Sequence, residues 1–73
     1  MEKLTVEEKS VVEFALQDYI WSENGAANRF EERAASAEDE KDRARLMKLA
    51  AECRGRVERA KSALLKLATG ESL

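Results

Sequence analysis

A repeating pattern of apolar residues runs through the second half of the chain. Its members recur at steps of four and three and are Leu46, Ala50, Cys53, Val57, Ala60, Leu64 and Leu67. Positions three and four apart lie on one face of an α-helix, so the pattern predicts a single long amphipathic helix. Three of these seven residues are small, so this face, the seam, allows a second helix to approach closely.

The first half of the chain carries another apolar stripe with helical spacing. It consists of Val12, Leu16, Tyr19, Ala26 and Phe30, broadened by Ala15, Ile20, Ala27 and Ala34, and Glu23 interrupts it. Before the stripe, Thr5 and Glu8 have the spacing of a capping box, in which each side chain accepts a hydrogen bond from the other residue's backbone N–H. We therefore expect a helix that begins near Val6.

The Asn24-Gly25 pair is the strongest helix-breaking signal in the chain. Both residue types tolerate the left-handed backbone conformation that ends helices. The apolar stripe nevertheless resumes in phase after Gly25, which argues against a full stop. We expect a helix over residues 6–34 with a kink or a weak point, rather than a complete break, at 24–25.

A short polar turn separates the two helical patterns. Ser36 has the character of an N-cap, and the acidic residues of the segment AEDE that follows it suit the first turn of a helix because the helix dipole favours negative charge there. Gly70 stands where a residue just beyond a helix end is expected. The second helix is therefore predicted over 37–69, and residues 1–73 are predicted to form one all-α domain, an antiparallel two-helix hairpin.

Folding the chain at Ser36 predicts which residues of the two helices meet. The expected pairs are Tyr19 with Cys53, Leu16 with Val57, and Val12 with Ala60. Large side chains of the first helix then meet smaller ones of the seam, which permits close packing at a shallow crossing angle.

The first helix is apolar on its other side as well. Val11, Phe14 and Trp21 are turned away from the stripe, and the acidic residues Glu13 and Asp18 flank them. Contiguous exposed aromatic residues usually mark an interface. We therefore predict that Val11, Phe14, Asp18 and Trp21 form an interface through which the hairpin dimerises into a four-helix bundle.

Composition and charge agree with a helical protein that has a small core. The 73 residues include no Pro and three Gly, and a chain of this length buries only about 60% of the surface that its unfolded form exposes. Residues 1–40 hold eleven acidic and four basic side chains, a net charge of −7, whereas residues 41–73 hold four acidic and nine basic ones, a net charge of +5. This opposition of charge favours antiparallel pairing of the two helices.

Residues suited to catalysis or metal binding are scarce. The chain has no His and one Cys, Cys53, which lies on the seam and is expected to be a small buried apolar residue. Glu38, Asp39, Glu40 and Asp42 form an acidic cluster without the Gly and the loop spacing of an EF-hand. We therefore predict a non-enzymatic protein with no catalytic, cofactor-binding or metal-binding residue.

The basic second helix raises an alternative function, the binding of nucleic acid. Arg54, Arg56 and Arg59 are the residues that would contact phosphates in that case. Basic residues are, however, spread over all sides of this helix outside the seam, and the first helix is acidic. Nucleic-acid binding is therefore a less favoured alternative, as is a purely structural homo-oligomer.

The sequence shows no signal for export or for membrane insertion. The segment MEKLTVEEKS does not resemble a signal peptide, and no stretch approaches the roughly 18 uninterrupted apolar residues of a membrane span. A single Cys excludes a disulfide within the chain. We expect a cytoplasmic protein without membrane contact.

The segment LTVEEKSVVEFALQDYIW, followed by the charged hairpin and LLKLATGE, resembles the small helical-hairpin proteins encoded by phages and prophages. The resemblance covers most of the chain and carries over no functional residue. It implies an accessory protein that binds a host protein, such as a component of a defence system, and inhibits or redirects it. The function expected from the sequence is a homodimeric protein–protein interaction module with an unidentified protein partner.

Overall fold

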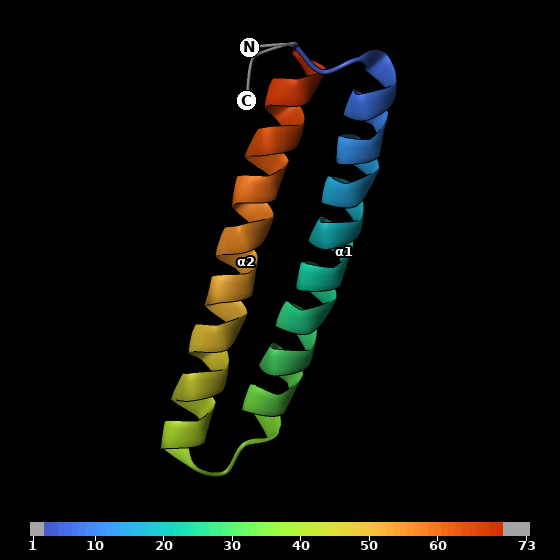
Figure 1. The fold of residues 1–73 in the computed structure, drawn as a ribbon. Coiled ribbons are helices and arrows are strands. Elements are labelled where there is room, and N and C mark those ends of the chain that lie inside the picture. Colours follow the sequence, from blue (N-terminus) through green and yellow to red (C-terminus); the bar gives the residue numbers. More distant parts are fainter. Residues whose placement is uncertain (1–2, 70–73) are drawn as a thin grey trace.

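The computed structural model describes residues 3–69, which form two long α-helices joined by a short connection. Helix α1 covers Val6–Ser36 and helix α2 covers Glu40–Ala68, and the two lie side by side and antiparallel (Figure 1). The hairpin measures 52 × 16 × 16 Å. The prediction of an all-α two-helix hairpin is confirmed for this part of the chain, in which no strand occurs.

Helix α1 begins with the capping box expected from Thr5 and Glu8. The Thr5 hydroxyl oxygen accepts a hydrogen bond from the Glu8 backbone N–H at 3.1 Å, and Oε1 of Glu8 accepts one from the Thr5 backbone N–H at 2.7 Å. The hydrogen bond from the Thr5 backbone N–H, followed by contact with the Thr5 side chain, lowers the pKa of Glu8 because both stabilise the ionised carboxylate. The predicted start of the helix near Val6 is confirmed.

Helix α1 passes through Asn24 and Gly25 without interruption. A Gly inside a helix costs only about 0.5–1 kcal/mol relative to Ala. The Asn24 side chain is held by α2, because Nη1 of Arg54 donates a hydrogen bond to its Oδ1 at 3.2 Å, and Ala27 is fully buried a turn later. Packing on α2 therefore outweighs the local tendency of the Asn-Gly pair to end the helix.

The connection between the helices lies later in the chain than the sequence pattern predicts. Ser36 does not cap α2; it is the last residue of α1, and its hydroxyl donates to the Glu32 carbonyl at 3.0 Å. The N-cap is Asp39, whose Oδ1 accepts a hydrogen bond from the Lys41 backbone N–H at 3.0 Å. Helix α2 therefore begins at Glu40 instead of 37, because Asp39 competes successfully with Ser36 as the capping residue.

Arg43 holds this connection closed. Its Nη2 donates to the Ala37 carbonyl at 2.7 Å, and its Nε donates to the Ala34 carbonyl at 3.4 Å. The acceptors are backbone oxygens of the last turn of α1 and of its C-cap residue Ala37, where carbonyls lack the partner that a helix interior provides; the Ala34 carbonyl also accepts a hydrogen bond from the Ala37 N–H at 3.2 Å. At the other end, α2 stops at Ala68, and the predicted role of Gly70 lies outside the described residues.

The seam of α2 forms most of the core, as the sequence pattern predicts. Leu64 is half-buried, and the buried members are Leu46, Ala50, Cys53, Val57, Ala60 and Leu67. Helix α1 contributes Ala27 and Ala34 to the buried set. Of its larger stripe residues, Val12, Leu16, Ile20 and Phe30 are half-buried, whereas Tyr19, expected to pack on Cys53, is exposed. Small residues from both helices are therefore the most buried, and the core of the hairpin is thin.

The later connection also shifts the pairing of the helices by about one turn. Glu23, which the sequence pattern left unpaired, lies against Cys53 and Arg56 of α2. Leu16 borders the same groove as Ala60, although the sequence pairs Leu16 with Val57. The expected register was wrong because it assumed that the chain folds at Ser36.

Candidate functional site

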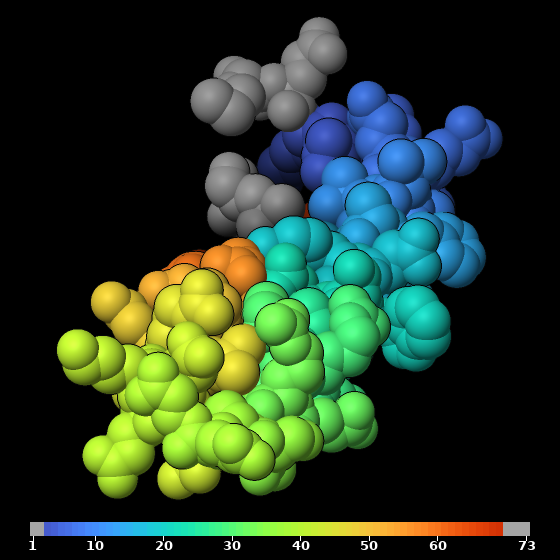
Figure 2. Space-filling model, turned by 90° about the horizontal axis from the view of Figure 1, so that it is seen from below, coloured from blue at the N-terminus to red at the C-terminus, as the bar shows by residue number. Residues whose placement is uncertain are grey.

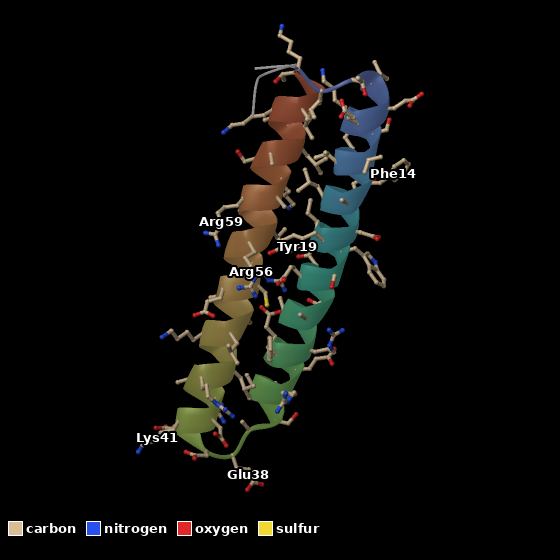
Figure 3. The ribbon with its side chains drawn as sticks, in the orientation of Figure 1. Phe14, Tyr19, Glu38, Lys41, Arg56 and Arg59 are labelled. Atoms are coloured by element: carbon tan, nitrogen blue, oxygen red, sulfur yellow. The ribbon has the colours of Figure 1, made fainter. Side chains whose placement is uncertain are left out.

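One side of α1 exposes large apolar side chains to solvent. Val11, Phe14 and Trp21 are 68%, 72% and 80% exposed, and Asp18, which lies among them on the helix surface, is also exposed. These four residues, here called the outer face, are the interface residues predicted from the sequence. In Figure 2, side chains from the blue-to-cyan part of α1 project on the side away from α2, and Figure 3 shows Phe14 pointing in that direction.

The outer face is large in relation to the core that the hairpin builds by itself. Phe and Trp side chains each bury about 150–250 Å² when they are fully covered. By contrast, the largest fully buried side chain in residues 3–69 is that of Cys53. Phe14 and Trp21, two of the largest apolar side chains of α1, are thus mostly left out of the core of the isolated hairpin.

A second feature is an open groove along one flank of the hairpin, with a volume of about 450 Å³. Its walls come from both helices and are Ala15, Leu16, Tyr19, Arg56, Arg59, Ala60 and Ala63. The hollow exists because three of these residues are Ala. Tyr19 of α1 and the two arginines of α2 add polar groups to the lining of this groove, the Ala groove, and Arg59 points away from α1 (Figure 3).

Glu23, Arg56 and Cys53 form a polar cluster between the helices beside the Ala groove. Nη2 of Arg56 lies 3.1 Å from Oε2 of Glu23 and donates a hydrogen bond to the Cys53 sulfur at 3.2 Å. The Glu23 side chain is only 19% exposed, and its Oε2 atom is shielded from solvent without a well-aligned hydrogen bond. The Arg56 guanidinium is therefore the charge that permits a carboxylate at this position.

This cluster shifts the pKa values of its members. Contact with Arg56, followed by contact with Cys53, lowers the pKa of Glu23 against the opposing effect of burial. Burial, followed by the neighbouring Glu23 carboxylate, raises the pKa of the Cys53 thiol. A buried thiol with a raised pKa is poorly reactive, so Cys53 has the properties of a structural residue.

Sequence reasoning treated Glu23 as an interruption of the apolar stripe and missed its role. The signal was present, because Glu23 lies in phase with Leu16 and Tyr19, four residues after Tyr19. A charged residue in phase with a buried stripe requires an opposite charge on the partner helix. Arg56 could not be chosen as that partner without the register of the two helices.

Arg54 makes a separate polar network on the opposite flank. Its guanidinium donates to Oδ1 of Asn24 at 3.2 Å, to Oδ1 of Asn28 at 3.0 Å and to Oε1 of Glu31 at 2.7 Å. Residues two apart on a helix do not share a face, so Arg54 and Arg56 straddle the seam. Both side chains are used to join α2 to α1.

The three arginines of the nucleic-acid alternative are therefore not equivalent. Arg54 pairs with Glu31 and Arg56 pairs with Glu23, whereas Arg59 is exposed and makes no ion pair within residues 3–69. A phosphate-binding surface needs several unpaired cations on one face. The structure divides these cations between two flanks and neutralises two of the three.

Other chemistry is sparse over the described part of the chain. Residues 3–69 contain no group of three or more acidic, Cys or His side chains placed to hold a metal ion. Neither described helix is both long enough and apolar enough to cross a membrane. The outer face and the Ala groove are two features of the described surface with a distinct shape and chemistry.

Comparison of the chain with protein-family models, with curated proteins and with solved structures finds no match.

The Glu23–Arg56 contact leads to a pH-dependent prediction. A carboxylate with a lowered pKa in the folded state adds stability above its unfolded pKa, about 4.3 for Glu, and this stability is lost as the pH falls through the folded pKa. In Arg56→Gln the contribution disappears. The difference in free energy of unfolding between wild type and Arg56→Gln is therefore expected to be largest above about pH 4.3 and to shrink in more acidic solution.

Urea denaturation at several pH values measures this difference, and an NMR titration of the Glu23 side chain should show a higher pKa in Arg56→Gln. The matched control is Arg45→Gln, since Arg45 is exposed and pairs with Asp42 of its own helix at 3.6 Å. The control should leave the Glu23 titration unchanged. An unchanged Glu23 pKa in Arg56→Gln would contradict the assigned contact.

Proposed function

We propose that this protein is a small non-enzymatic module that acts through protein–protein contact and forms a homodimer through the outer face of α1. The observation that carries the proposal is the exposure of Phe14 and Trp21, 72% and 80%, on a helix whose opposite side already packs on α2. Aromatic residues of this kind dominate the energetics of protein interfaces. A contiguous exposed set on a small protein typically marks an interaction surface.

A second copy of the chain is the occupant that the energetics favour. The hairpin core is thin, and chains of this size commonly need oligomerisation to reach useful stability. A dimer that covers Phe14 and Trp21 of both copies removes several hundred Å² of apolar surface from water, a substantial part of the roughly 1,200 Å² of a small specific interface. Two hairpins joined in this way form a four-helix bundle.

The dimer then presents its remaining surface to other proteins. Inhibition or modulation of a host protein, which the resemblance to phage-encoded hairpins implies, fits a module of this kind because it requires binding without catalysis. Nucleic-acid binding has less support, since Arg54 and Arg56 are paired with carboxylates of α1.

Light scattering and sedimentation equilibrium test the proposed dimer. The wild type is expected to be a dimer at micromolar concentration, and Phe14→Glu is expected to be a monomer because two buried carboxylates would face apolar surface. The matched control is Ala51→Glu, which adds the same charge at an exposed position of α2 and should remain dimeric. A folded wild type that stays monomeric at about 100 μM, far above the range of a specific dimer, would refute the proposal.

A further inference from the structure

We propose that the Ala groove of one copy receives Phe14 of a second copy and that Asp18 of this second copy pairs with Arg59. The inference rests on the proposed dimer and names the surfaces that meet in it. The outer face of one copy then contacts the Ala groove of the other, a surface built from both helices of that hairpin. The occupant is thus another copy of this chain.

The two surfaces are complementary in shape. The outer face is a ridge, because Phe14 and Trp21 stand out from α1 with most of their surface exposed. The Ala groove is the complementary hollow, an open groove with a volume of about 450 Å³. Its apolar floor, with Leu16 and Ala60, matches an aromatic ring in chemistry as well as in size.

The two surfaces are also complementary in charge. Asp18 and Arg59 are both exposed, and neither makes an ion pair within residues 3–69. Asp18 lies on the ridge and Arg59 on the edge of the groove. The ridge therefore brings an unpaired negative charge to a hollow with an unpaired positive charge, the arrangement that sets orientation at an interface.

These residues also lie at matching levels along the hairpin. Leu16 borders the same groove as Arg59 and Ala60, so residues 14–18 of α1 lie at about the height of residues 59–63 of α2. Asp18 follows Phe14 by one helical turn, and Arg59 precedes Ala63 by one turn, about 6 Å in each case. Phe14 of one copy can therefore lie at the level of Ala63 of the other copy, and Asp18 at the level of Arg59. Because α1 and α2 run in opposite directions, both of these contacts form together when the two α1 helices of the dimer are parallel.

This arrangement satisfies the symmetry of a dimer. A two-fold axis parallel to the helices places Phe14 of each copy beside the groove of the other at the same height, so the contact is made twice. Trp21, two turns beyond Phe14, then reaches the end of the groove where Tyr19 and Arg56 lie. Each α1 helix lies between its own α2 and the opposite hairpin.

A charge-exchange experiment tests the pairing. Asp18→Arg and Arg59→Glu are each expected to weaken the homodimer by about tenfold or more, because each creates like-charge contacts twice in the dimer. An equimolar mixture of the two variants should form a heterodimer with a dissociation constant within about threefold of the wild-type value, since one contact joins the two substituted residues, which have opposite charges, and the other keeps the native Asp18 and Arg59. Sedimentation equilibrium measures the affinities, and circular dichroism verifies that each variant is helical.

The outcomes separate this inference from the proposed dimer. In one outcome the wild type is a dimer and Phe14→Glu is a monomer, but neither charge variant changes the dimer affinity. The proposed dimer is then supported, and the assignment of the Ala groove as its contact surface is refuted. If both variants weaken the dimer but their mixture is not restored, the two residues do not face each other and the assignment also falls. A monomeric wild type overturns both proposals. Asp42→Arg, a charge reversal at an exposed position of α2 near the connection, is the control and should leave the affinity unchanged.

Discussion

Leu46→Ala is expected to lower the free energy of unfolding by about 2–5 kcal/mol, the range for removing a well-buried leucine side chain. Leu46 is the first residue of the seam and is only 5% exposed. The substitution removes apolar contacts and leaves a cavity that two long rigid helices cannot easily close. Since a domain of about this size has a total stability of roughly 4–11 kcal/mol, the loss is a large fraction of the whole.

Urea denaturation followed by circular dichroism measures the effect, with all variants at one protein concentration because a dimer's stability depends on concentration. The matched control is Leu65→Ala on the same helix, since Leu65 is 65% exposed and its loss should change the free energy of unfolding by about 0.5 kcal/mol or less. Similar losses at both positions would show that the seam does not face α1.

Ala27→Leu is the second substitution with a large expected effect, a loss of about 1–3 kcal/mol from overpacking. Ala27 has no exposed surface, and a leucine there must push α2 away or adopt a strained rotamer. Since 1 kcal/mol corresponds to a change of roughly 4–8 °C in the thermal midpoint of a domain of this size, the midpoint should fall by several degrees or more.

The control for this prediction is Ala35→Leu, a similar change at an exposed position of the same helix. It should leave the thermal midpoint near the wild-type value. Differential scanning calorimetry of the two variants makes the comparison. A thermal midpoint of Ala27→Leu equal to that of the wild type would mean that the helices are not in close contact at Ala27.

The amino-acid sequence by itself determined the features that depend on local rules. The seam followed from steps of four and three, because a regular helix brings those positions to one face. The capping box followed from the spacing of Thr5 and Glu8, because the hydrogen bonds that form it span three residues. The exposed outer face around Phe14 and Trp21 followed from the same periodicity, since a helix cannot turn both sides toward one partner.

Only the tertiary structure decided how the helices are aligned and what that alignment creates. Ser36 and Asp39 are both good capping residues, so the sequence alone could not place the connection, and an error of three residues moves the register by almost one turn. The contact of Glu23 with Arg56 and the hollow of the Ala groove both depend on that register. They join residues more than thirty positions apart, whose meeting is settled by packing and charge between helices and not by the pattern within either one.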